Sequence, residues 1–182
     1  MKNHEHLGPL KFLVGTWTGE GGKDLSPEPD GTEENIYHET ITFTPIGDVD
    51  NAEEQELVGV HYHQVVHRTR DSKHLHDQSG YWMWEKESGA VIHSLSIPRG
   101  VTVVTEGTAE EQDNGIKISV ATDPEKNHIS ETSFMANKAK TLSHRAVLEV
   151  SDAELRYKQT TLVDIYGREF KHIDENTLLK QA

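Results

Sequence analysis

The stretch "GTWTGEG", residues 15–21, places three glycines and one tryptophan within seven residues. Glycine is unfavourable inside a helix or a strand, so its repetition here needs a reason. Strand side chains alternate between two faces, which puts the glycines and Trp17 on one face and the polar residues on the other. The stretch therefore predicts a strand with a nearly bare inner face. Either the strand bends tightly there or something lies against its backbone.

Alternating segments rich in β-branched and aromatic residues follow, such as 36–45 and 56–67, at intervals of roughly ten residues with turn signals between them. One short helix is expected within 6–15, and 124–138 favours loop or strand. This spacing predicts an all-β fold of one domain over residues 1–182. We expect a ten-stranded, antiparallel, up-and-down β-barrel, lipocalin-like, with a short N-terminal helix and room for a small-molecule ligand.

Residues 21–35, "GGKDLSPEPDGTEEN", are rich in glycine, proline and acidic residues. Such a composition is typical of a loop, and the segment is longer than most connections. We therefore expect a lid or a rim element at this place.

Composition restricts the partners of the chain. Its 182 residues carry a formal net charge of −13 and no cysteine. The acidity argues against nucleic acid and against anionic membrane surfaces, which bind through Lys and Arg. The first twelve residues hold no apolar run typical of a secretion signal, and no run suits a membrane span. A cytoplasmic location is expected, and a homodimer stays open.

Several motifs, taken in order, resemble the nitrobindin family of haem-binding β-barrels. They are the Gly-Trp stretch after "LGPLKFLV", then "ETITFTPIG" at 39–47, "LHDQSGYW" at 75–82, "IPRGV" at 97–101 and "FKHIDENTLL" at 170–179. The resemblance implies a ten-stranded barrel similar to fatty-acid-binding proteins. It further implies haem b with ferric iron, nitric oxide binding, and, if haem is bound, isomerisation of peroxynitrite to nitrate.

By position in these motifs, the resemblance implies that His172 is the axial iron ligand and that His76 lies near the haem without binding it. Asp174 and Glu175, which follow His172, would be costly beside a haem unless they point outward. Strand position and the family match together give five candidates for the pocket lining: Trp17, Thr40, Thr42, Ile97 and Pro98.

Two other functions remain open. The barrel could carry a fatty acid or another small apolar molecule without iron, with Arg99, Arg145 or Arg156 receiving a carboxylate. Alternatively, His61 and His63 share a strand face and could contribute to a non-haem metal site, because imidazole is the commonest metal ligand. No nucleophile elbow, P-loop or dinucleotide fingerprint occurs in the sequence, so hydrolase and kinase chemistry have no support.

Overall fold

The computed structural model describes residues 4–51 and 54–182. It begins with a 3-10 helix, η1 (Glu5–Phe12), and is otherwise dominated by long strands. The strands and the one short α-helix are β1 (Gly15–Glu28), β2 (Gly31–Pro45), β3 (Leu57–Arg68), β4 (His74–Glu85), β5 (Ala90–Ile97), β6 (Val101–Gln112), β7 (Gly115–Ala121), β8 (Ile129–Glu131), α1 (Ser133–Lys138), β9 (Ala139–Val150), β10 (Glu154–Ile165) and β11 (Arg168–Lys180).

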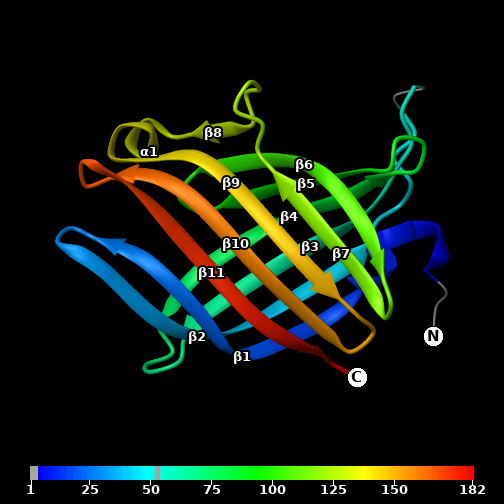
Figure 1. Ribbon diagram of the computed structural model, residues 1–182, viewed down its shortest axis with the longest axis horizontal. Coiled ribbons are helices and arrows are strands. Elements are labelled where there is room, and N and C mark those ends of the chain that lie inside the picture. The colour runs from blue at the N-terminus through cyan, green and yellow to red at the C-terminus, as the bar shows by residue number, and fades with distance from the viewer. Residues whose placement is uncertain (1–3, 52–53) are drawn as a thin grey trace.

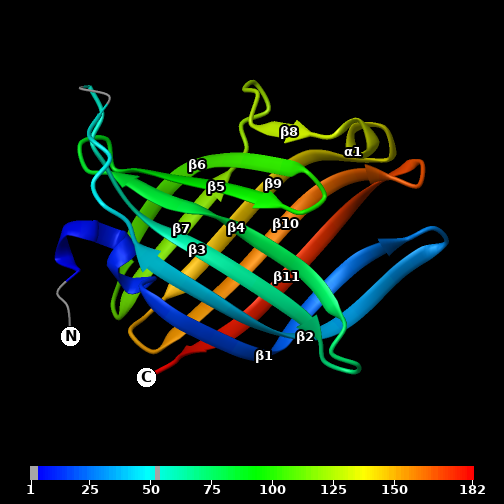
Figure 2. The ribbon, with the colours of Figure 1, turned by 180° about the vertical axis from the view of Figure 1, so that it is seen from behind.

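The strands close into the expected antiparallel barrel. Each of β1 to β6 pairs with the next strand, β7 pairs with β9, β9 with β10 and β10 with β11, and the ring closes where β11 meets β1. The short strand β8 adds to β6 outside this ten-stranded ring. Closure pairs the backbone of every strand in the ring on both sides, which removes exposed sheet edges. Figures 1 and 2 show the strands wrapping around one interior.

The two ends of the barrel differ. At the base, beside both termini in Figure 1, η1 packs Leu7 and Leu10 against the core. Trp17 is fully buried there, and its Nε1 donates a hydrogen bond to the Leu13 carbonyl at 2.7 Å. The opposite end, the mouth, carries the β1–β2 hairpin, α1 and the β10–β11 turn (Figure 1). Trp17 therefore plugs the base.

The inner face changes from polar at the mouth to apolar at the base. On β2 the inward residues run Asn35, Tyr37, Glu39, Ile41, Phe43, and on β11 they run His172, Asp174, Asn176, Leu178. Period-2 alternation places them inside, and the residues between them face out. Apolar burial thus supports the base, while polar side chains line the mouth.

The glycine-rich stretch faces inward only in part. Between Gly19 and Gly22, β1 has one more residue than the facing part of β2, which is a β-bulge. The extra residue reverses the alternation, so Gly22 is buried and Gly21 is exposed. The expectation of an inward Gly21 is corrected accordingly. A Cβ on Gly22 would lie 2.1 Å from the Tyr37 ring, so the bare wall accommodates a side chain of the barrel itself.

Two expected loops are also corrected. Residues 21–35 form the long ends of β1 and β2, which pair as far as Glu28 and Gly31 around a two-residue turn. Segment 124–138 contains β8 and the helix α1, whose N-cap Thr132 accepts a hydrogen bond from the Met135 amide. Backbone pairing within the hairpin outweighs the unfavourable composition of the first segment. None of the described helices is long and apolar enough to cross a membrane.

Gly19→Ala should destabilise the protein, because the added Cβ would lie 2.8 Å from both the Asn176 amide nitrogen and the Thr177 carbonyl oxygen. Overpacking of this kind costs about 1–3 kcal/mol. Gly21→Ala is the matched control, since its Cβ would meet nothing within 4 Å. Urea unfolding of both variants measures the difference. Equal stability of the two would contradict the inward placement of Gly19.

Candidate functional site

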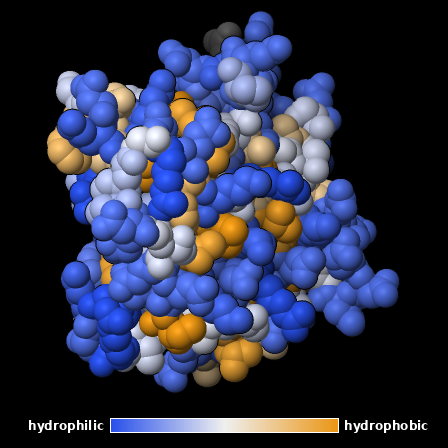
Figure 3. Space-filling model, turned by 60° about the vertical axis from the view of Figure 1, so that its left-hand side comes forward, coloured by the Kyte–Doolittle hydropathy of each residue, from blue (hydrophilic) through white to orange (hydrophobic). Residues whose placement is uncertain are grey.

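A cavity of about 1100 Å³ opens at the mouth of the barrel. Its wall on β5, β6 and α1 is apolar, with Leu95, Ile97, Val101, Val103, Phe134 and Met135. The wall on β1, β2, β9 and β11 carries acids, amides and histidines. Figure 3, which brings this side of the molecule forward, shows hydrophobic residues set among hydrophilic ones. The cavity is large enough for a cofactor and is amphipathic.

A layer of buried polar side chains lies between the cavity and the apolar base, and its central group is the Glu39 carboxylate. Glu39 accepts hydrogen bonds from Tyr157 at 2.8 Å, Asn176 at 2.7 Å and Gln64 at 2.6 Å. Because Tyr157 donates its only hydroxyl proton to Glu39, its hydroxyl oxygen accepts a hydrogen bond from the Tyr37 hydroxyl, and the two oxygens are 2.6 Å apart. Burial nevertheless raises the pKa of Glu39 to about 6, because the three hydrogen bonds compensate only partly for lost hydration.

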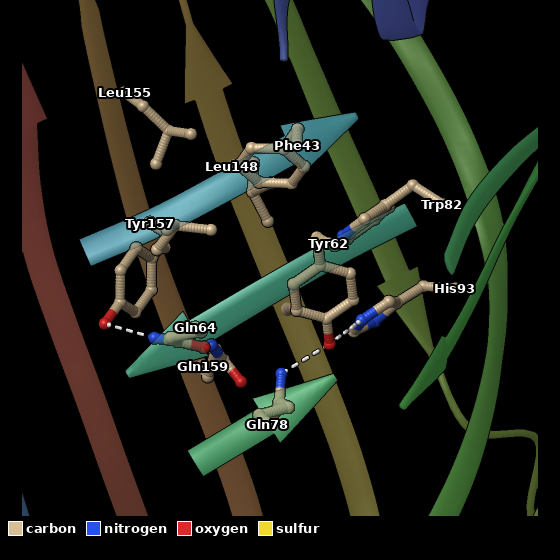
Figure 4. A pocket seen from close by; sticks show the side chains of 12 residues that line it. Phe43, Tyr62, Gln64, Gln78, Trp82, His93, Leu148, Leu155, Tyr157 and Gln159 are labelled. Atoms are coloured by element: carbon tan, nitrogen blue, oxygen red, sulfur yellow. Dashed lines mark hydrogen bonds between the residues drawn. The ribbon is translucent and has the colours of Figure 1, made fainter. Parts of the chain in front are cut away.

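The same layer continues across the barrel through Gln78, Tyr62 and His93, as Figure 4 shows. Gln78 donates to the Tyr62 hydroxyl at 2.6 Å, and that hydroxyl lies 2.8 Å from His93 Nε2. His93 stacks on Trp82 with ring centroids 3.9 Å apart. Burial lowers the pKa of His93 well below its ordinary value, so the ring is neutral. Its Nδ1 is buried without a hydrogen-bond partner.

Above this layer, His144, Thr161 and His172 form one row across β9, β10 and β11, because they are directly paired in the two ladders. His144 Nδ1 lies 2.9 Å from the Thr161 hydroxyl, and His144 Nε2 is buried without a partner. Burial, reinforced by the nearby imidazoles of His76 and His172, lowers the pKa of His144 to about 4. His144 is therefore a neutral imidazole.

His172 is held by carboxylates. Its Nε2 lies 2.7 Å from Asp24 Oδ1 and 3.6 Å from Asp174 Oδ1, so the Nε2 proton faces Asp24. Burial disfavours the charged ring, but the Asp24 hydrogen bond and the charges of Asp174 and Asp24 outweigh it, and the pKa of His172 is raised. A proton on Nε2 leaves Nδ1 as the nitrogen with a lone pair in the neutral ring.

The two carboxylates beside His172 differ in character. Burial opposes ionisation of Asp24, yet hydrogen bonds from His172, Asn35 and Ser26 hold the pKa of Asp24 below its ordinary value. Burial and the charge of Asp24 raise the pKa of Asp174. Asp174 lines the cavity with its Oδ1 3.6 Å from His172 Nε2, so it points inward and does not meet the condition under which an acid beside a haem avoids a cost. Glu175 does face out and pairs with Lys158 at 3.0 Å.

The structure brings together three of the residues predicted for the site. His172, His76 and Ile97 line the cavity, and His76 Nε2 lies 3.2 Å from Gln78 Oε1. Trp17 lies in the core at the base, away from the cavity lining. Pro98 is exposed in the β5–β6 turn.

Thr40 and Thr42 lie on the outer face of β2. Ile41 and Phe43 occupy the alternate positions and face the core, so period 2 sends both threonines outward. The alternation of that segment could have revealed this placement from the sequence. The missed site residues Asp24, His144 and Asp174 gave no comparable signal, because their meeting depends on how three strands pair.

The observations weigh against the alternative functions. Arg145 and Arg156 are exposed, and the cations that line the described part of the cavity, Arg99, Lys138 and Lys140, belong to the mouth. A buried fatty-acid carboxylate would instead meet Asp24 and Asp174. His61 bonds Ser79 at 3.0 Å and exposed His63 bonds Asp77 at 3.2 Å. Neither belongs to the three-residue metal-ligand cluster found among the described residues.

Apart from the inward carboxylates of Asp24 and Asp174, which are paired with His172, the lining of the cavity fits a haem. One wall is apolar, as a porphyrin requires, and the opposite wall presents imidazoles, the commonest protein ligands of haem iron. His144 Nε2 lacks a partner, and His172 Nδ1 is free of the Asp24 hydrogen bond. Cations at the mouth complement the carboxylates of a haem b.

Comparisons with known proteins agree with this fit. A family model described as a THAP4-like, heme-binding beta-barrel domain matches residues 6–180. Among solved structures, Rv2717c from M. tuberculosis superposes with a TM-score of 0.73 at 20% identity, covering 96% of this chain and 98% of that chain. This likeness concerns the fold. No curated protein matches the sequence.

The buried neutral His144 should make stability fall in acid. Its folded-state pKa of about 4 lies below the ordinary histidine value of 6.5, so the unfolded chain takes up a proton first as the pH falls. Stability from this group is present above pH 6.5 and is lost as pH falls toward 4, by about 3 kcal/mol in full. His144→Gln should flatten the pH dependence by that amount. Unfolding free energies from urea titrations between pH 4.5 and 7.5 measure it, and equal slopes in both proteins would contradict the burial of a neutral ring.

Proposed function

Because the chain belongs to the THAP4-like, heme-binding beta-barrel domain family, as its resemblance to nitrobindins predicted, we propose that it holds ferric haem b in the mouth cavity and acts on small nitrogen oxides. Haem is the cofactor of this family, and the cavity supplies its small-molecule site. The proposed reactions are binding of nitric oxide and isomerisation of peroxynitrite to nitrate. Action in the cytoplasm, a homodimer and the absence of nucleic-acid partners remain predictions.

The row of His144, Thr161 and His172 on the inner wall is the observation that carries the proposal. We propose His172 as the axial ligand through Nδ1. The hydrogen bond from Nε2 to Asp24 fixes the ring and its tautomer, as carboxylates do for many metal-binding histidines. Ligation needs the neutral ring, so binding releases the proton that the carboxylates favour, and affinity should fall in acid.

Haem held in this cavity would supply an iron to which a small ligand can bind. The apolar wall of β5 and β6 limits water on one side of the cavity, and the lining also carries the His76 imidazole and the neutral imidazole of His144. Peroxynitrite and nitrate contain the same atoms and charge, so the isomerisation requires no second substrate. The residues that line the cavity then have to orient the peroxynitrite anion and exclude water.

Haemin titration tests the ligand. In wild type, haemin should give a sharp Soret band, and His172→Ala should weaken affinity by about tenfold or more, equal to 1.4 kcal/mol. His61→Ala, on the outer wall beside Ser79, is the matched control and should bind as wild type does. The same titration of His144→Gln shows which of the two histidines of the row binds the iron.

A wild-type spectrum in His172→Ala would exclude His172 as the ligand, and loss of the band in His144→Gln alone would assign the iron to His144. Stopped-flow decay of peroxynitrite with the haem-loaded protein tests the reaction. Nitrate formation no faster than with free haemin would contradict the proposed isomerase activity while leaving haem binding intact.

A further inference from the structure

Asp24, His172 and Asp174 form a compact ligand cluster in the polar wall of the cavity. Each can offer one ligand atom, and these atoms all lie within 4.8 Å of one another. The side chains come from only two neighbouring strands, β1 and β11, and Asp24 and Asp174 lie in a stretch of unbroken register, Lys23 to Leu25 opposite Glu175 to Ile173. The backbone therefore holds the three groups close together.

The cluster concentrates negative charge. Asp24 and Asp174 are directly opposite each other in the β1–β11 register, where like charges destabilise a sheet. Within residues 4–51 and 54–182, the ion pairs of both carboxylates involve His172 and no lysine or arginine. One imidazolium balances at most one of the two charges, so the arrangement is suited to an additional cation.

Hydrogen bonds from neighbouring side chains orient the cluster, as they do around many metal sites. Asn35 Nδ2 and Ser26 Oγ both donate to Asp24 Oδ2 at 3.1 Å, which directs Oδ1 toward His172. Such outer hydrogen bonds orient metal-binding carboxylates. Asn35 is 4% exposed, and its own Oδ1 is buried without a partner beside the cluster. The three cluster residues and the supporting Asn35 and Ser26 all line the open cavity, through which a hydrated ion can enter.

We propose that Asp24, His172 and Asp174 bind a divalent transition-metal ion of the Zn²⁺ type, a site additional to haem binding. One imidazole and two carboxylates are ligands that Zn²⁺ accepts, and three protein ligands leave a position for water. The imidazole disfavours Mg²⁺ and Ca²⁺, which prefer oxygen ligands.

The ion and the haem compete for His172. A neutral imidazole has one lone pair, so its ring binds either the haem iron through Nδ1 or the divalent ion through Nε2. Competition depends on the proposed function, but binding of the ion to the haem-free protein does not. The zinc site and the proposed haem function can therefore be contradicted independently of each other.

Zinc titration of untagged, haem-free protein by calorimetry tests the site. Wild type should bind one Zn²⁺, and Asp174→Asn and Asp24→Asn should each weaken this binding by about tenfold or more. Asp77→Asn is the matched control, because Asp77 also lies between two histidines, His63 and His74, but on the outer face. Thermal unfolding of each variant confirms that it is folded. If only one of the two aspartate variants folds, that variant is enough to test the zinc site.

Haemin titration of the same proteins separates the two ligands. Zn²⁺ should inhibit haemin uptake in wild type, and this inhibition, measured against the zinc-free titration of the same protein, should be lost in Asp174→Asn. Absence of zinc binding in wild type would overturn the proposal, as would unchanged affinity in both aspartate variants. Loss of zinc binding in Asp77→Asn alone would assign the ion to the outer histidines and would also overturn it.

Discussion

The buried carboxylate of Glu39 is the constraint on which the interior depends. An ionised carboxylate is costly to bury unless hydrogen bonds replace its water, and Glu39 obtains three, from Gln64, Tyr157 and Asn176. The donors come from three other strands, so satisfying this one group fixes the relative placement of β2, β3, β10 and β11. The same layer divides the barrel into an apolar base and a cavity at the mouth.

The glycines of β1 serve this layer. A side chain at Gly19 would collide with the Asn176 amide that donates to Glu39. A side chain at Gly22 would overlap the ring of Tyr37, whose hydroxyl donates to Tyr157. The bare wall thus accommodates polar side chains of the barrel, and the bulge between the two glycines turns each toward them. Trp17 lies two residues nearer the base than Gly19 and fills the apolar end of the barrel beneath η1.

The wall above the layer holds two histidines whose pKa values are shifted in opposite directions. His144 lies in a desolvated position that keeps it neutral, whereas His172, two strands away in the same row, is drawn toward its charged form by Asp24 and Asp174. Thr161 between them bonds His144. The cavity wall thus carries one imidazole held neutral by burial and one paired with two carboxylates.

The sequence alone determined the barrel, the short N-terminal helix and the family, because alternation, turn spacing and ordered motifs are local properties of the chain. It also placed His172 and His76 at the cavity. Only the tertiary structure decided that Gly22 replaces Gly21 on the inner face, since a bulge depends on pairing with β2. The meeting of Asp24 with Asp174 and His172 likewise arose from closure of β1 on β11, which joins residues about 150 positions apart that no local pattern relates.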